Sequence, residues 1–265
     1  SIQVYRELKI LSARPTLKKY KKIKHHLYGF KSVKKNFSTG DWLKLVNKKI
    51  LYIKKRKKIP ILVGGTGLYF KALTEGLVQI PNIPKKIRNQ IRLLHKKIGP
   101  KKFFLKLIKL DPLIQNSINS SDTQRVIRAY EVKLFTNKSI REWFKSTKSR
   151  YDRNDFFKIY IDFPRKDLLS RIEMRVHQMI KNGAVQEAKK FIKLKIPEDK
   201  TAYKAIGIKE LIEYIKKNIQ IDEVIQKISI KTRQYAKRQV TWARGHMKSW
   251  KKIEPKRLNI FLKKI

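Results

Sequence analysis

Cysteine is absent from the 265-residue sequence, which excludes disulfide bonds and thiolate metal sites. No apolar run reaches the roughly 18 residues that a membrane span requires, so no membrane partner is expected. The opening stretch, SIQVYRELKI, lacks the basic and then apolar pattern of a secretory signal. These absences together favour a soluble, cytoplasmic protein.

Acidic residues are scarce, since 20 of them face 67 lysines and arginines, for a formal net charge of +47. Such a field attracts polyanions, of which nucleic acid is the commonest. A biased composition gives the same excess without selection for binding, because lysine, isoleucine and asparagine are all abundant. Charge alone therefore leaves the two explanations evenly matched.

No linker rich in glycine and serine divides the chain, but its character changes twice along its length. Residues 1–83 and 149–265 mix short apolar runs with amphipathic patterns, which indicates an α/β core. Residues 84–148 form consecutive helical patterns broken by proline, glycine and asparagine. We therefore expect a parallel sheet core with an all-helical insertion.

The expected elements follow from hydrophobic periodicity. Strand candidates are residues 3–5, 25–30, 59–65 and 155–164, and the third is a continuous apolar run typical of a strand buried on both faces. Helices are expected at residues 41–54, 167–181, 183–193, 205–217 and 222–244. Thr39 is the expected cap of the first of these helices.

The stretch ILVGGTGLYF, residues 61–70, places a glycine-rich turn between an apolar run and a helical pattern. Glycines let backbone N–H groups approach a ligand, and a helix N-terminus favours anionic groups. Thr66 would stand at the carboxyl end of a strand, where open α/β sheets bind ligands. A plain strand-to-helix turn explains the same spacing, and no G-x-x-x-x-G-K-[ST] phosphate loop occurs in the sequence.

Two further segments carry cations at helical spacing. In SSDTQRVIRAYEV, residues 120–132, Ser121 and Gln124 have capping-box spacing, and the arginines that follow could bind base edges or phosphates. In residues 222–245, an apolar stripe consists of Val224, Ile228, Tyr235 and Trp242. A cationic stripe of Arg233, Lys237 and Arg244 lies opposite it. By spacing alone, a cap followed by solvated charges is the favoured interpretation of the first segment, whereas a solvated face and a binding face are evenly matched for the second.

Several segments in order along the chain resemble the tRNA dimethylallyltransferase family, also called tRNA isopentenyltransferase. They are SIQVYRELKI, ILVGGTGLYFKAL, DTQRVIRAYEV, KAIGIKEL and TRQYAKRQVTWARG. The resemblance implies transfer of a dimethylallyl group from dimethylallyl diphosphate to N6 of adenine 37, in tRNAs reading codons that start with U. It also implies a P-loop NTPase-like core and an insertion at residues 84–148 that grips the anticodon stem-loop. Mg²⁺ is the implied cofactor, and a monomer is expected.

The resemblance assigns roles position by position. Thr66 and Arg233 are the catalytic candidates, and Arg233 together with Gly64 and Gly65 is directed at the diphosphate. The positions that correspond to tRNA-contacting residues of the family are Ser1, Ile2, Gln3, Arg88, Gln124, Arg125, Val126, Ile127, Arg128, Lys204, Ala205, Ile206, Gly207, Ile208 and Lys209.

The sequence departs from the family pattern at its start. The family's first strand, phosphate loop and general-base aspartate precede the position of Ser1 and do not occur in these 265 residues. We therefore expect a fragment without detectable transfer activity, and no metal ligand is assigned because the implied ligands lie mostly in that segment. The alternatives are a non-catalytic tRNA-binding remnant and a P-loop enzyme of small substrates, which the tRNA-type segments disfavour.

Overall fold

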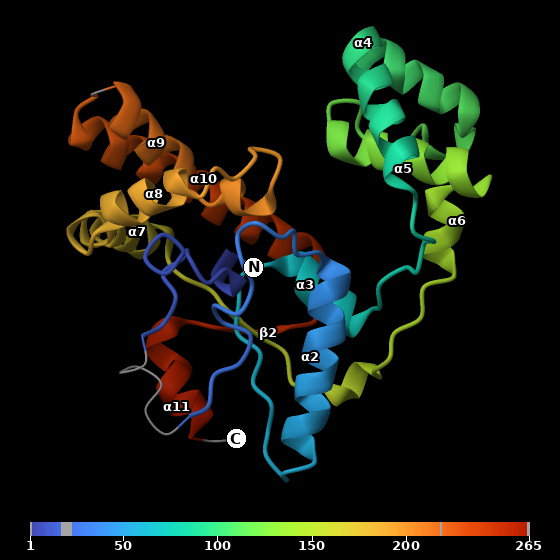
Figure 1. Cartoon of the computed structure of the whole chain (residues 1–265). Coiled ribbons are helices and arrows are strands. Elements are labelled where there is room, and N and C mark those ends of the chain that lie inside the picture. The colour runs from blue at the N-terminus through green and yellow to red at the C-terminus, as the bar shows by residue number, and fades with distance from the viewer. Residues whose placement is uncertain (1, 17–22, 218, 264–265) are drawn as a thin grey trace. The chain divides into compact units, whose positions relative to one another are not determined.

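The computed structural model describes residues 2–16, 23–217 and 219–263, apart from the side chain of Arg153. The chain divides into two compact units (Figure 1). The first comprises Ser1–Phe70 with Phe156–Ile265, and the second comprises Lys71–Asp155, a wider range than the expected insertion at residues 84–148. No helix within the described ranges combines the length and apolar character that a membrane crossing requires.

The first unit is mostly helical. Its α-helices are α2 (Thr39–Lys54), the first turn of α3 (Gly67–Thr74), α7 (Arg165–Lys181), α8 (Ala184–Lys193), α9 (Ile208–Lys217), α10 (Ile221–His246) and α11 (Leu258–Leu262). Its 3₁₀ helices are η1 (Ile2–Val4), η4 (Thr201–Lys204) and η5 (Pro255–Arg257). Helix α10 packs against both α7 and α9, and α8 packs against α7 and α9 (Figure 1).

The expectation of a parallel sheet is confirmed only on a small scale. Strands β1 (Ile159–Ile161) and β2 (Lys251–Ile253) pair in parallel, with Tyr160 opposite Lys252. The expected strands at residues 3–5 and 25–30 were wrong, since η1 covers part of the first and a single parallel bridge joins Tyr5 to Lys31 beyond the second.

The expected buried strand at residues 59–65 was also wrong. Ile59, Ile61 and Val63 are 86%, 80% and 84% exposed, and the segment has no strand assignment. A strand buried on both faces needs hydrogen-bonded neighbours and covering helices, and none of the strands in the described ranges pairs with this segment. Its apolar composition alone could not form the strand.

Helix α2 shows how local chemistry sets an element's start. Ser38, rather than the expected Thr39, is the N-cap. The Ser38 hydroxyl accepts from the Asp41 backbone N–H at 3.1 Å, and the Asp41 carboxylate accepts from the Ser38 backbone N–H at 3.0 Å. This reciprocal capping box lowers the pKa of Asp41, chiefly through the hydrogen bonds from Ser38.

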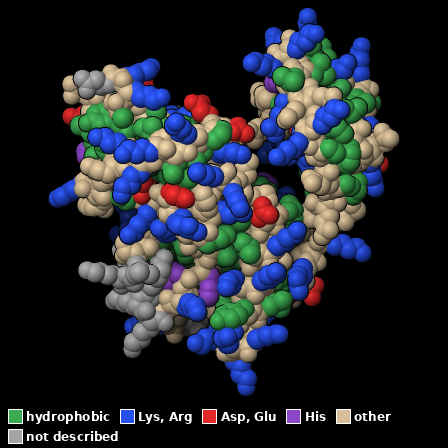
Figure 2. Space-filling view, in the orientation of Figure 1, with side chains coloured by type: hydrophobic (Ala, Val, Ile, Leu, Met, Phe, Trp, Pro, Cys, Tyr) green, Lys and Arg blue, Asp and Glu red, His purple; other side chains and the backbone are tan. Residues whose placement is uncertain are grey.

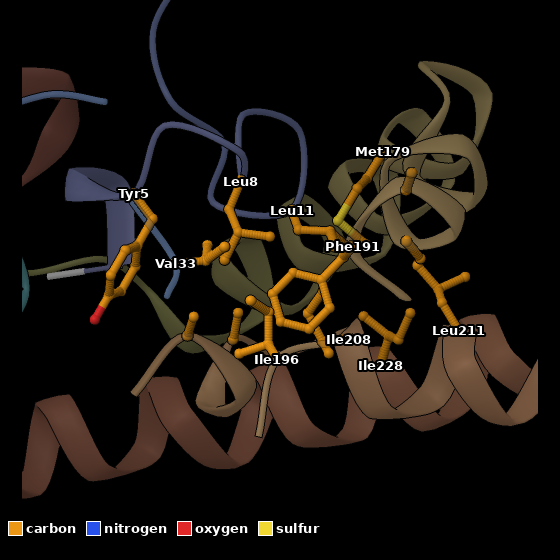
Figure 3. Packing of buried hydrophobic residues seen from close by; sticks show 14 of the residues in the cluster. Tyr5, Leu8, Leu11, Val33, Met179, Phe191, Ile196, Ile208, Leu211 and Ile228 are labelled. Atoms are coloured by element: carbon orange, nitrogen blue, oxygen red, sulfur yellow. The ribbon is translucent and has the colours of Figure 1, made fainter. Parts of the chain in front are cut away.

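The core of the first unit joins the N-terminal segment to helices α7, α8, α9 and α10. Figure 3 shows Leu8 and Leu11 of the N-terminal segment on the side of the cluster where Phe191 of α8 and Ile228 of α10 lie, with Tyr5 at one end. All five are almost fully buried. The segment before α2 is therefore held by side chains that lie nearly two hundred residues later.

A carboxylate on α8 fixes the backbone of that N-terminal segment. Glu187 Oε2 accepts from the N–H groups of Lys9 and Ile10 at 2.9 and 2.8 Å, and Oε1 accepts from Leu11 at 2.9 Å. Three successive N–H groups that converge on one anion form a concave binding site for it. The carboxylate thereby satisfies backbone donors that no strand or helix satisfies.

The second unit contains helices α4 (Lys85–Leu110), α5 (Thr123–Thr136) and α6 (Ile140–Lys145), with the short 3₁₀ helices η2 (Pro112–Ile114) and η3 (Arg153–Asp155). Helix α4 bends where Gly99, at a φ of 77°, precedes Pro100. Both halves of α4 then pack their apolar sides on α5, and Phe103, Leu107 and Ala129 are fully buried between them.

Replacing Glu187 with alanine should lower the free energy of unfolding by about 3 kcal/mol, because three backbone N–H groups lose a charged acceptor. Glu198→Ala is the matched control, since Glu198 is exposed and should change stability by less than about 0.5 kcal/mol. Urea unfolding of the two variants measures the difference. Equal stability of the two variants would contradict the role given to Glu187.

Candidate functional site

The glycine turn lies against α10. Gln239 of α10 donates from Nε2 to the Gly65 carbonyl at 2.9 Å. The Thr66 carbonyl accepts from the Tyr69 N–H at 2.9 Å and so begins α3 at Gly67. The turn is thus fixed on one side by its own helix and on the other by a side chain that is 174 residues away in sequence.

Close approach by α10 explains two of the three glycines. A Cβ on Gly67 would lie 2.2 Å from the Trp242 ring, and a Cβ on Gly65 would lie 2.1 Å from the Gln239 amide. A Cβ on Gly64 would meet nothing within 4 Å. None of the three has the positive φ that favours glycine, so packing by Gln239 and Trp242 accounts for Gly65 and Gly67, and Gly64 alone has open space beside it.

The two catalytic candidates lie on different faces of this arrangement. Arg233 and Trp242 are nine residues apart on α10, which corresponds to about 180° around the helix and about 13 Å along it. Since Trp242 contacts the glycine turn, Arg233 projects away from that contact. The partly buried Arg233 and the exposed Lys237 and Arg244 form the expected cationic stripe, while Tyr235 of the expected apolar stripe is 39% exposed.

The stripe ends beside the small sheet. Burial and the neighbouring Asp162 raise the pKa of Tyr160 on β1, and the positive charge of Arg244 opposes that rise. The carboxyl end of α10 therefore brings a cation near Tyr160, the middle residue of β1.

The N-terminal candidates are held by internal hydrogen bonds. Gln3 donates from Nε2 to the Ala13 carbonyl at 3.0 Å, and its own carbonyl accepts from Gly29 at 2.9 Å. Ile2 is half-buried against the core of the first unit, and Ser1 lies outside the described residues. The Gln3 amide is thus oriented by the backbone of this segment.

Only the two ends of the stretch at residues 204–209 are exposed. Ala205, Gly207 and Ile208 are buried and Ile206 is half-buried, so side-chain contact with a ligand falls to Lys204 and Lys209. Gly207 has a φ of 102° and donates its N–H to Glu210 Oε2 at 2.8 Å. Glu210, which is 4% exposed, also forms an ion pair with Lys231 of α10.

In the second unit, helix α5 begins with Asp122 as its N-cap, and the expected capping box of Ser121 and Gln124 was wrong. The Ser121 hydroxyl instead donates to Asn119 Oδ1 at 2.8 Å, while Asp122 accepts from the Arg125 N–H at 3.1 Å. Asp122 competes successfully because its carboxylate also pairs with the Arg125 side chain, at 3.3 Å.

The candidates on α5 separate by burial. Gln124 and Arg125 are exposed in the first turn, Ile127 and Arg128 are half-buried, and Val126 is buried in the core. Arg128 and Arg88 of α4 each contact the carboxylate of Glu131. Sequence reasoning did not single out Glu131, although its spacing of three residues from Arg128 is that of a helical ion pair.

Figure 2 shows lysine and arginine side chains spread over the visible face of each unit, with few acidic side chains among them. Within the residues that the structure describes, no group of three histidine, aspartate or glutamate side chains could hold a metal ion. The expected Mg²⁺ therefore stays a prediction, and no step is assigned to it.

Comparison with known proteins identifies the family. A family model described as IPP transferase matches residues 3–246. A tRNA dimethylallyltransferase of Pelagibacter ubique is 55% identical over all 265 residues, which cover 85% of its length. The chain belongs to the IPP transferase family. The resemblance found in the sequence motifs is therefore confirmed.

Solved structures of IPP transferases agree with this assignment. The full-length tRNA isopentenylpyrophosphate transferase from Bacillus halodurans superposes with a TM-score of 0.66 at 32% identity, over 96% of this chain and 79% of that one. A eukaryotic dimethylallyltransferase described as acting on tRNA superposes with a TM-score of 0.79 at 27% identity, over 92% of this chain and 61% of that one.

Sequence reasoning did not connect Gln239 or Trp242 with the glycine turn, although Trp242 was expected on the apolar stripe of this helix. Both lie in the segment TRQYAKRQVTWARG, which carried the resemblance as a whole. No signal within the segment pairs these side chains with glycines more than 170 residues earlier. Their role became visible only in the folded chain.

Gly67→Ala should lower the free energy of unfolding by about 1–3 kcal/mol, since its Cβ must displace the Trp242 ring. Gly64→Ala is the matched control and should change it by less than about 0.5 kcal/mol, because space is open there. Thermal unfolding measures both. Equal losses in the two variants would show that Trp242 does not set the requirement for glycine.

Proposed function

We propose that this chain acts in the transfer of a dimethylallyl group from dimethylallyl diphosphate to N6 of adenine 37 in the anticodon loop of tRNA. The proposal rests chiefly on the match to a tRNA dimethylallyltransferase along the entire chain, at 55% identity. It takes the first unit as a P-loop NTPase-like core and the second unit as the part that grips the anticodon arm.

The charge of both units supports a tRNA substrate. Phosphate neutralisation by lysine and arginine supplies most of the affinity of proteins for nucleic acid. The exposed Lys204 and Lys209 in the first unit, and the exposed Arg125 in the second, are available for such contacts. Gln124 and Arg125 occupy the first turn of α5, where side chains reach past the helix end toward a ligand.

The proposal gives Arg233, Thr66 and Gly64 separate roles. Arg233, partly buried on α10, would stabilise the charge that grows on the diphosphate as the carbon–oxygen bond breaks. Thr66, at the start of α3, would hold the adenosine. Gly64, beside open space, would admit close approach of a phosphate to the backbone.

The chain should bind an anticodon stem-loop with A36 and A37 more tightly than a stem-loop with other bases at these positions. Affinity should fall steeply with salt, because each neutralised phosphate contributes about 0.7–0.9 to the slope of log K against log salt. Fluorescence anisotropy with labelled stem-loops over a salt series measures both effects. Equal affinity for any polyanion of the same length would show that the positive charge reflects a biased composition and not a specific tRNA site.

In an enzyme restored with the family's N-terminal segment, Arg233→Ala should lower the transfer rate by about 10²-fold at saturating tRNA, the usual loss when one donor to developing negative charge is removed. Lys237→Ala, which removes one charge from the same stripe, is the matched control and should change the rate by less than about threefold. Steady-state rates with each substrate varied in turn separate the two. If the variant binds tRNA more weakly but keeps its rate at saturating tRNA, Arg233 contacts the RNA backbone and not the diphosphate.

A further inference from the structure

A single buried carboxylate in the second unit faces three arginines. Glu131 of α5 is 1% exposed. Its Oε2 lies 3.4 Å from Arg88 Nε and 3.4 Å from Arg128 Nη1, and its Oε1 lies 3.9 Å from Arg92 Nε. Arg88 and Arg92 occupy successive turns of α4, so the cluster spans the contact between the two helices.

Burial on this scale is unusual for a carboxylate and costs several kcal/mol unless cations compensate it. The compensation here is asymmetric, because the carboxylate is buried while its partners reach solvent. The side chains of Arg88, Arg92 and Arg128 are 40%, 55% and 39% exposed. One negative charge inside therefore organises three positive charges at the surface, which leaves a local excess of two.

The contacts with Glu131 use only some of the N–H donors of each guanidinium group, so the other donors remain available to a ligand. Arg88 and Arg92 approach Glu131 through Nε, the donor closest to the aliphatic stem, so their terminal Nη groups extend beyond the contact. No second carboxylate of the described residues lies within 4.0 Å of any of the three guanidinium groups. A guanidinium held at one edge presents its other donors in a fixed direction, which suits a phosphate.

We propose that Glu131 is a positioning residue that holds Arg88, Arg92 and Arg128 as a preformed site for phosphates of the RNA backbone. The inference rests on the proposed function, since the ligand is the tRNA substrate. Free arginine side chains lose considerable rotamer entropy when they bind, and anchoring them in advance lowers that cost. Glu131 thus increases affinity for a polyanion despite its own negative charge.

The proposal is testable because it predicts a change in RNA affinity opposite in sign to the change that net charge alone predicts. Glu131→Gln and Glu75→Gln each raise the net charge by one within the same unit, and Glu75 is an exposed residue that pairs with Lys71 at 3.7 Å. Long-range attraction alone predicts that both variants bind RNA slightly more tightly. The positioning role predicts that Glu131→Gln weakens binding by about tenfold, the effect of losing one charge-assisted hydrogen bond.

The measurement is fluorescence anisotropy with an A36-A37 stem-loop across a salt series, alongside thermal unfolding of each variant. Glu131→Gln should lower the salt slope as well as the affinity, because fewer phosphates are neutralised at once. In an Arg88→Ala/Arg128→Ala background the same change should have little further effect on affinity. Affinity equal to that of Glu75→Gln, or an undiminished effect in that background, would overturn the proposal.

A second variant covers the case in which Glu131→Gln does not fold. Arg88→Lys keeps the charge and leaves no buried anion without cations, but an ammonium that pairs with Glu131 presents no second donor in a fixed direction to a phosphate. It should weaken binding by several fold, whereas Arg141→Lys, an exposed arginine of the same unit, should not. Equal affinities for these two variants would contradict the proposal, and failure of the unaltered chain to prefer the A36-A37 stem-loop would instead contradict the proposed function.

Discussion

A chain with a formal net charge of +47 folds against repulsion among its own side chains. Its 20 acidic residues are too few to pair with 67 basic ones, so the position of each carboxylate matters. Three of these carboxylates each bind backbone N–H groups or cationic side chains that link different parts of the chain. Glu187 gathers three backbone N–H groups, Glu210 joins the start of α9 to α10, and Glu131 faces three arginines between α4 and α5.

Helix α10 organises the first unit in a comparable way. Its first half buries Val224 and Ile228 in the core, and its second half supports the glycine turn through Gln239 and Trp242. The cationic stripe lies on the opposite face of α10. The helical period of 3.6 residues places residues that alternate in the sequence on different faces of the helix. Helix α10 therefore fixes the positions of the glycine turn, the core residues and the cationic stripe relative to one another.

The parts of this fold that the sequence predicts are those determined by nearby residues. The ranges of α7, α8 and α10 differ from the expected helices by two residues or fewer at each end, because amphipathic periodicity is a local signal. The strands depend on partners far along the chain. Residues 59–65 have strand composition without a paired neighbour, whereas the lysine-rich β2 was not expected because its partner supplies the pairing.

The candidate site divides in the same way. The glycine turn was found from its composition, but the reason for Gly65 and Gly67 lies in side chains of α10 that no local pattern connects to them. The buried members of the stretch at residues 204–209 match the family as well as the exposed ones do, and only burial distinguishes Ile208 from Lys209. Sequence similarity thus located the segments, and packing decided which side chains in them are exposed.

Exposed flexible lysines and arginines anchored by a carboxylate contribute differently to the recognition of one RNA by so basic a protein. Exposed lysines attract every polyanion to a similar degree, since a flexible ammonium contacts a phosphate in many geometries. Discrimination requires donors whose positions are set before the ligand arrives. In the described part of the second unit, the arginines that face Glu131 meet that requirement, because a buried anion fixes one edge of each guanidinium. A scarce carboxylate placed in the core therefore converts nonspecific positive charge into a directed binding surface.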